Sequence, residues 1–216
     1  MPIYTKDKIN IFFSHIPKCG GESITHFFES NGYSLHFHLR SPGCDKLNKP
    51  CSLQHRDNND PDLFNFLSNT NITYSFTIVR DPFARVVSEF FMRQSQINNK
   101  TVDDFYRFII QSFIEYKKNP YTHDNHIKPQ INFIHPNINI YKFGDFKKIY
   151  DTIKSIDPSI KNSIIKHNSG VETKPFNGSY EYAREKLNWK ISPKIKSSIL
   201  NFYKEDYDFI NSTNFK

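Results

Sequence analysis

The apolar residues of this chain fall into short segments with the spacing of buried strands or of one helix face. Runs of β-branched and aromatic residues predict strands at 9–15, 72–79 and 138–143. Helical spacing of apolar residues predicts these helices: 22–31, 61–69, one that begins at 82, about 101–118, 144–155 and 192–211.

Capping and turn residues indicate where some of these segments begin and end. Asp81 is a natural N-cap and Pro82 suits the first helical position, so a helix should start directly after the strand at 72–79. The segment 32–60 is expected to be irregular, because it contains turn signals such as Pro42-Gly43.

Strand–turn–helix units recur along the chain, which favours an α/β fold with a mainly parallel, P-loop-like sheet flanked by helices. The length of 216 residues suits one domain with a sizeable core. Because the sequence contains no repeat and no linker, we expect a single domain over residues 1–216.

Charge and composition narrow the class of partner. Lys and Arg number 29 against 22 Asp and Glu, and the resulting net charge of +7 favours anionic partners. The longest apolar runs span only a few residues, where a membrane helix needs roughly 20, so no integral membrane segment is expected. The odd number of cysteines, three, and a start without a signal-peptide apolar core favour a cytoplasmic location.

The stretch FFSHIPKCGGESI, residues 12–24, joins a predicted strand to a predicted helix through a glycine-rich turn. Backbone N–H groups of such a turn, together with a helix N-terminus, form an anion site. Gly20 and Gly21 allow a close approach, Ser23 adds a hydroxyl and Lys18 adds a charge. The alternative is an ordinary turn whose glycines only supply a positive φ.

A second stretch, IVRDPFARVVSEF at residues 78–90, has a similar position after a strand. Arg80 closes the strand and Ser88 lies about two turns into the next helix, so both can meet one anion at the carboxyl edge of the sheet. Alternatively, Arg80 pairs with Asp81 or a helix end and Ser88 only packs. Two anion sites suggest a ligand with two separated phosphate-like groups.

The two stretches together resemble the carbohydrate sulfotransferases that use 3′-phosphoadenosine 5′-phosphosulfate. Residues 17–23 match the Pro-Lys-x-Gly-Gly-Thr-Ser loop of that family, except that Glu22 replaces Thr, and residues 80–88 match Arg-Asp-Pro-x-x-Arg-x-x-Ser without exception. Residues 126–134 resemble its His-x-x-Pro-Gln element, and 202–210 its closing Tyr-x-x-Asp-Tyr helix.

The resemblance implies sulfuryl transfer from this donor to a hydroxyl of a glycan or glycolipid, with adenosine 3′,5′-bisphosphate as the product. Lys18 would act on the leaving group, so it counts as catalytic and as cofactor-binding. The implied cofactor-binding residues are Lys18, Cys19, Gly20, Gly21, Glu22, Ser23, Arg80 and Ser88. His126 and Gln130 would bind the acceptor substrate.

The acceptor hydroxyl needs a general base, and the stretch QHRD offers His55, which partly resembles a Leu-His-Ala-Asp element of the family. His36, His38 and His126 are rivals for this role. A zinc site at His36, His38, Cys44, Cys51 and His55 is conceivable, but the spacing fits no standard zinc pattern, so no metal is expected.

Two other functions compete with sulfotransfer. A P-loop nucleotide kinase would need its Lys after the glycines, followed by Ser or Thr for magnesium. A non-catalytic binder of anionic glycans is the other alternative, with the basic net charge as its main feature. A degenerate relative that binds the donor without turnover also stays open, because the Glu22 carboxylate would repel a bound phosphosulfate. No nucleic-acid motif is present and the basic residues are dispersed, so no nucleic-acid partner is expected. The oligomeric state stays open.

Overall fold

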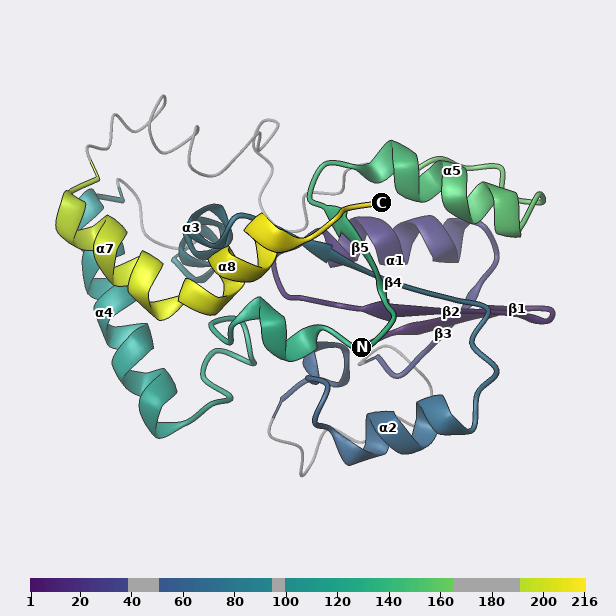
Figure 1. The fold of residues 1–216 in the computed structure, drawn as a ribbon, viewed down its shortest axis with the longest axis horizontal. Coiled ribbons are helices and arrows are strands. Elements are labelled where there is room, and N and C mark those ends of the chain that lie inside the picture. The colour runs from purple at the N-terminus through teal and green to yellow at the C-terminus, as the bar shows by residue number, and fades with distance from the viewer. Residues whose placement is uncertain (39–50, 95–99, 165–190) are drawn as a thin grey trace. The chain divides into compact units, whose positions relative to one another are not determined.

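The computed structural model describes residues 1–38, 51–94, 100–164 and 191–216 (Figure 1). The chain divides into two compact units. The described residues of unit 1 are 1–38, 51–79, 130–164 and 214–216, and those of unit 2 are 80–94, 100–129 and 191–213. The prediction of a single domain stays a prediction.

Unit 1 contains a five-stranded sheet in the order β3-β1-β2-β4-β5. The strands are β1 (Ile3–Lys6), β2 (Ile9–Ser14), β3 (Ser34–His36), β4 (Tyr74–Val79) and β5 (Asn139–Lys142). β2, β4 and β5 run parallel, while β1 pairs antiparallel with both β2 and β3.

The register of β2 and β4 follows from their buried apolar residues. Phe13 pairs with Phe76, and their rings stack with centroids 4.9 Å apart. At the carboxyl end, the Thr77 hydroxyl donates to the Ser14 carbonyl over 2.8 Å. The two strands therefore end at the same edge of the sheet.

Helices cover both faces of this sheet within unit 1 (Figure 1). α1 (Gly21–Ser30) and α5 (Phe146–Ile156) lie on one face, and α2 (Pro61–Ser68) lies on the other. Two short 3₁₀ helices, η1 (Leu53–His55) and η2 (Gln130–Phe133), complete the described elements of the unit.

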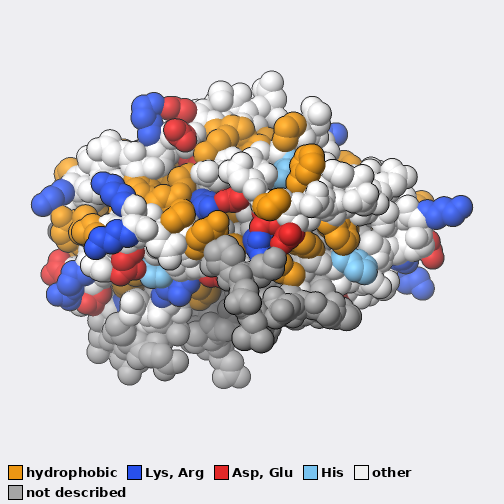
Figure 2. Space-filling model, turned by 90° about the horizontal axis from the view of Figure 1, so that it is seen from below, with side chains coloured by type: hydrophobic (Ala, Val, Ile, Leu, Met, Phe, Trp, Pro, Cys, Tyr) orange, Lys and Arg blue, Asp and Glu red, His pale blue; other side chains and the backbone are white. Residues whose placement is uncertain are grey.

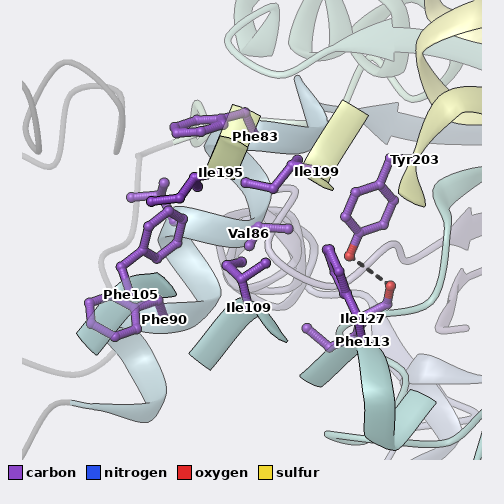
Figure 3. Packing of buried hydrophobic residues seen from close by; sticks show 11 residues of the cluster. Phe83, Val86, Phe90, Phe105, Ile109, Phe113, Ile127, Ile195, Ile199 and Tyr203 are labelled. Carbon is purple, nitrogen blue, oxygen red and sulfur yellow. Dashed lines mark hydrogen bonds between the residues drawn. The ribbon is translucent and has the colours of Figure 1, made fainter. Parts of the chain in front are cut away.

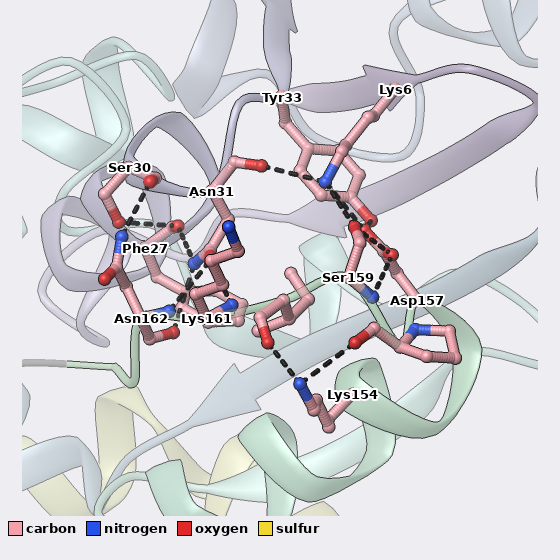
Figure 4. A network of polar contacts seen from close by, with 12 residues as sticks. Lys6, Phe27, Ser30, Asn31, Tyr33, Lys154, Asp157, Ser159, Lys161 and Asn162 are labelled. Carbon is pink, nitrogen blue, oxygen red and sulfur yellow. Dashed lines mark hydrogen bonds and ion pairs between the residues drawn. The ribbon is translucent and has the colours of Figure 1, made fainter.

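A polar network closes the edge of unit 1 at the end of α5 (Figure 4). The buried Asp157 carboxylate accepts hydrogen bonds from Lys6 Nζ at 3.1 Å, Tyr33 Oη at 3.0 Å and Ser159 Oγ at 2.6 Å. Burial would raise the pKa of Asp157, but these hydrogen bonds outweigh it and hold the pKa at about 2.

Unit 2 is helical in the part of the chain that the structure describes. Its helices are α3 (Pro82–Arg93), α4 (Val102–Lys118), α7 (Pro193–Phe202) and α8 (Lys204–Ser212). Their apolar faces form one core (Figure 3). Phe202 packs against this core and stacks on Phe113, with ring centroids 3.8 Å apart. Among the described residues, no helix has both the length and the apolar character that crossing a bilayer requires.

The structure confirms the predicted α/β class, the three predicted strands and every predicted helix before residue 192, with ends shifted by a few residues. Two expectations were wrong. Segment 32–60 contains β3, and the predicted helix 192–211 is two helices separated at Tyr203. The strand β1 was not predicted. β1 and β3 are too short to show a period in the sequence. β1 forms by pairing with β2, and β3 forms by pairing with β1.

We expect Asp157→Ala to lower the free energy of unfolding by about 1–3 kcal/mol, because it leaves the buried Tyr33 hydroxyl without its acceptor and removes the ion pair with the half-buried Lys6. Since the pKa of Asp157 lies below the ordinary value of 3.8, its contribution is complete above pH 4 and is lost as the pH falls towards 2. Urea unfolding at several pH values measures the difference between variant and wild type.

Asp151→Ala is the matched control. Asp151 lies on the same helix, α5, and pairs with Lys147 over 2.6 Å on the exposed surface. Its removal should change stability little at any pH. Equal effects of the two substitutions would contradict the importance of the Asp157 network.

Candidate active site

The glycine loop, residues 17–23, follows β2 and opens α1. Gly20 is the N-cap of α1 with φ +90°, a left-handed conformation that glycine adopts without steric cost. Lys18 is also left-handed, at φ +68°, which costs a residue with a side chain about 1–2 kcal/mol. The surrounding structure therefore imposes the conformation that carries Lys18.

Gly21 is required for a different reason, namely its contact with His15. A Cβ atom added to Gly21 would overlap the His15 imidazole. His15 is 6% exposed and stacks on Phe13 of β2 with ring centroids 5.5 Å apart. The His15 ring therefore lies directly against the first turn of α1.

This first turn is suited to bind an anion. The first N–H groups of a helix have no partner within the helix, and the helix dipole adds positive potential there. Gly21 and Ser23 are buried, whereas the Glu22 side chain between them is exposed. Because the Glu22 carboxylate is exposed, its backbone N–H group can still face an anion together with those of Gly21 and Ser23. Glu in place of Thr at this position is therefore compatible with anion binding.

The helix η2 supports the glycine loop. The Cys19 thiol donates to the Gln130 side-chain oxygen over 3.6 Å, and both residues are fully buried. The Ser14 hydroxyl donates to the Phe133 carbonyl over 2.5 Å. Gln130, predicted to bind substrate, thus contacts the loop, and its role towards substrate stays a prediction.

His55 is held in place by contacts of the residues that directly follow it in the chain. Arg56 forms a buried ion pair with Asp60, which also caps α2. Farther on, the Asn58 N–H donates to the Asn132 carbonyl over 3.0 Å. The segment that carries His55 is therefore attached to both α2 and η2.

The rings of His55 and His15 meet edge to face, with centroids 5.1 Å apart. His15 in turn contacts Gly21, so one imidazole ring separates His55 from the glycine loop within unit 1. His36, a rival of His55 for the role of general base, is hydrogen-bonded through Nε2 to the Thr5 hydroxyl of the neighbouring strand, at 2.9 Å.

The other predicted site residues, Arg80, Ser88 and His126, belong to unit 2. Arg80 directly follows β4 and is 8% exposed, and Ser88 is half-buried on α3. Asp81 caps α3 as predicted, by accepting a hydrogen bond from the Ala84 N–H at 2.8 Å.

A polar stripe on α3, formed by Arg85, Glu89 and Arg93, holds the segment 123–128. The three residues are spaced four apart and share one face of the helix. Arg85 is fully buried and donates to the carbonyls of His126 and Lys128, at 2.8 and 2.9 Å.

Glu89 and Arg93, the C-terminal part of the stripe, hold two histidines of this segment. Glu89, also fully buried, accepts from His126 Nδ1 at 2.5 Å. Arg93 donates to Glu89 at 2.5 Å and to the His123 carbonyl at 2.8 Å. Arg85, which the motif contains, is therefore a structural residue rather than a ligand of the donor.

The segment held in this way is strained. His123, Asp124 and Asn125 have φ values of 54°, 58° and 64°, three consecutive left-handed residues with side chains. Each such residue costs on the order of 1–2 kcal/mol, and such strain persists where surrounding contacts over-determine it. Burial lowers the pKa of His123 and the charge of Arg93 lowers it further, so this ring is neutral at pH 7.

Tyr203 adds a further contact to the same segment. Its hydroxyl donates to the Ile127 carbonyl over 2.8 Å (Figure 3). Complete burial raises the pKa of Tyr203, so the hydroxyl keeps its proton and remains a donor. The closing motif of the sequence thus supports the His-x-x-Pro-Gln element.

The sequence did not reveal four residues that shape these sites: His15, Arg85, Glu89 and Tyr203. The spacing of Arg85, Glu89 and Arg93 on one helix was a usable signal, because polar residues at i, i+4 and i+8 interrupt an otherwise apolar helix. Nothing in the sequence showed that His15 packs against Gly21.

Comparison with known proteins gives one match. A family model described as the sulfotransferase family matches residues 1–211, which is nearly the whole chain. No curated protein and no solved structure matches the chain.

We expect Gly21→Ala to lower the free energy of unfolding by about 1–3 kcal/mol, because its methyl group overlaps the His15 ring. His15→Ala in the same chain should remove most of this cost, since it vacates the space. Denaturant unfolding of both single variants and the double variant measures the coupling.

Gly32→Ala is the control for this cycle. Gly32 has φ +81° but open space around an added Cβ, so its substitution costs backbone strain alone. That cost should be the same with and without His15. If Gly21→Ala lowers the free energy of unfolding equally with and without His15, the contact between the two residues does not constrain the loop.

Proposed function

This chain belongs to the sulfotransferase family, and we propose that it transfers the sulfuryl group of 3′-phosphoadenosine 5′-phosphosulfate to a hydroxyl of a glycan or glycolipid. The observation that carries this proposal is the glycine loop. It sets a left-handed Lys18 before the N-terminus of α1, where two glycines bring the backbone N–H groups close to an anion.

The loop would bind the phosphosulfate end of the donor. The N–H groups of Gly20, Gly21, Glu22 and Ser23 suit its oxygens, and Cys19 keeps the loop anchored to η2. Lys18 would donate to the bridging oxygen, which gains negative charge as the S–O bond breaks. Stabilisation of a developing charge is often the largest part of catalysis.

Arg80 and Ser88 would bind the 3′-phosphate of the donor. Arg80 follows the carboxyl end of β4 directly, and Ser88 is half-buried on α3. The guanidinium matches phosphate in geometry and charge, and a hydroxyl adds one donor. These contacts lie away from the transferred group, so they contribute binding rather than chemistry.

His55 would take the proton of the acceptor hydroxyl. As the acceptor oxygen forms its bond to sulfur, His55 removes the hydroxyl proton and the bridging oxygen leaves with the electron pair. The position of His55, one imidazole ring from the glycine loop, supports this role. A positioned base typically contributes about 10²–10⁴ in rate.

The proposed partners and location follow the same resemblance. A glycan or glycolipid is the proposed acceptor, with His126 and Gln130 as acceptor-binding residues, and small alcohols or phenols are the second choice. The proposed location is cytoplasmic. The alternative of a polyanion binder rests on net charge alone, and Figure 2 shows Lys and Arg interspersed with Asp and Glu on the face that it presents.

Thermal unfolding with candidate ligands tests this function. Adenosine 3′,5′-bisphosphate at about 100 times its dissociation constant should stabilise the protein by roughly 2.7 kcal/mol. Stabilisation only by ATP with magnesium would favour a nucleotide kinase, and stabilisation only by heparin would favour a non-catalytic binder. Either result would refute the proposed function.

We expect His55→Ala to lower kcat by about 100-fold or more and leave the KM for the donor near that of wild type. The wild-type rate should fall on the acid side, where a histidine base becomes protonated, and this limb should disappear in the variant. Steady-state kinetics across pH measures both.

Arg80→Ala is the matched comparison. It should raise the donor KM and largely preserve kcat, because its contact is the same in the ground state and the transition state. An acid limb that survives in His55→Ala would assign the base to another residue.

A further inference from the structure

His15 contacts both parts of the proposed reaction site within unit 1. It directly follows β2 and is 6% exposed, and its ring stacks on Phe13 with centroids 5.5 Å apart. Its ring atoms Nε2, Cε1 and Cδ2 occupy the space that a Cβ atom on Gly21 would need. The ring therefore lies against the first turn of α1, where the phosphosulfate is proposed to bind.

A second contact of the His15 ring is with His55. The two rings meet edge to face, with centroids 5.1 Å apart and planes inclined by 68°. His55 is buried as well, with 9% of its surface exposed. The imidazole of His15 thus fills space between the proposed base and the glycine loop.

Water in this space would compete with the acceptor. In the proposed reaction, the acceptor oxygen lies between His55 and the sulfur, in line with the bridging oxygen of the donor. A water molecule placed there would react in the same way. His55 would take one of its protons, its oxygen would bond to sulfur, and the bridging oxygen would leave with the electron pair of the broken S–O bond. The products would be sulfate and adenosine 3′,5′-bisphosphate, so the donor would be lost without transfer.

We propose that the His15 ring excludes water from the space between His55 and the glycine loop, so that the donor reacts with the acceptor and not with water. This role rests on the proposed sulfotransfer with His55 as the base. It needs the volume of the ring, and neither a free ring nitrogen nor a particular charge.

Removal of the ring should admit water. A water molecule needs a space of about 30 Å³ and polar partners, and apolar cavities of that size stay dry. The space vacated in His15→Ala borders the first turn of α1 and the ring of His55, and both are polar. We therefore expect this space to be hydrated.

Hydrolysis of the donor in the absence of any acceptor measures the exclusion of water. With saturating 3′-phosphoadenosine 5′-phosphosulfate, the rate of sulfate release should rise about tenfold in His15→Ala over wild type. His15→Asn also shortens the side chain, so it should show a smaller rise, and it carries the test if His15→Ala does not fold. His15→Gln nearly preserves the side-chain volume and should stay within about twofold of wild type.

The extra hydrolysis should depend on His55, because water also needs a base. The double variant of His15→Ala and His55→Ala should therefore release sulfate no faster than wild type. His26→Ala is the matched control, because it removes an exposed imidazole from α1 and should leave hydrolysis unchanged. A ring that only packs the loop would alter stability or the donor KM, but not hydrolysis at saturating donor. Hydrolysis at the wild-type rate in both His15→Ala and His15→Asn, or an equal rise in His15→Gln, would overturn the proposal.

NMR of the histidine rings tests the same arrangement without donor or acceptor. In wild-type protein, the ring protons of His15 and His55 should show a mutual nuclear Overhauser effect, because the rings are in contact. In His15→Ala, the effect between water and the His55 ring protons should be stronger than in wild type. Absence of the first effect, or no change in the second, would contradict the exclusion of water by His15.

These experiments separate the role of His15 from the proposed function. If wild-type protein transfers sulfate to a methyl glycoside or to phenol, but every His15 variant hydrolyses the donor at the wild-type rate, sulfotransfer stands and the role of His15 is overturned. If wild-type protein binds no adenosine 3′,5′-bisphosphate, the proposed function fails and the role of His15 fails with it.

Discussion

The parallel pairing of β2 with β4 is the constraint on which unit 1 depends. Both strands are buried over their last four residues, and the stacking of Phe13 on Phe76 sets their register. Parallel strands need a long crossover, so the chain between them must supply α1 and α2. The glycine loop lies at the carboxyl edge of the sheet because β2 ends there, and α1 begins where that loop can present its N–H groups.

Unit 2 depends on the burial of a charge instead. A guanidinium taken out of water is costly unless its donors are satisfied, and Arg85 meets this need with two carbonyls of the segment 126–128. Satisfying Arg85 therefore fixes the backbone around His126. Glu89, one turn farther along α3, then reaches the imidazole, so one structural requirement also orients a candidate functional group.

The predicted site residues that lie together in the structure are mostly neighbours within one sequence motif. The loop from Lys18 to Ser23 is one continuous motif, and Asp81 caps α3 next to Arg80 as its motif requires. His55 was placed in the site by resemblance alone. Its approach to the loop through His15 depends on packing between segments about 40 residues apart, which no local pattern encodes.

The sequence by itself determined the α/β class, the central strands, the glycine loop and the capped start of α3. Each is a local preference: β-branched runs extend, glycine accepts a positive φ, and aspartate before proline starts a helix. Only the tertiary structure decided the edge strands β1 and β3, the overlap that excludes a side chain at Gly21, and the roles of Arg85 and Glu89. These features arise from partners distant in the chain, because the free energy of a buried contact depends on what lies opposite in space and not on neighbours in sequence.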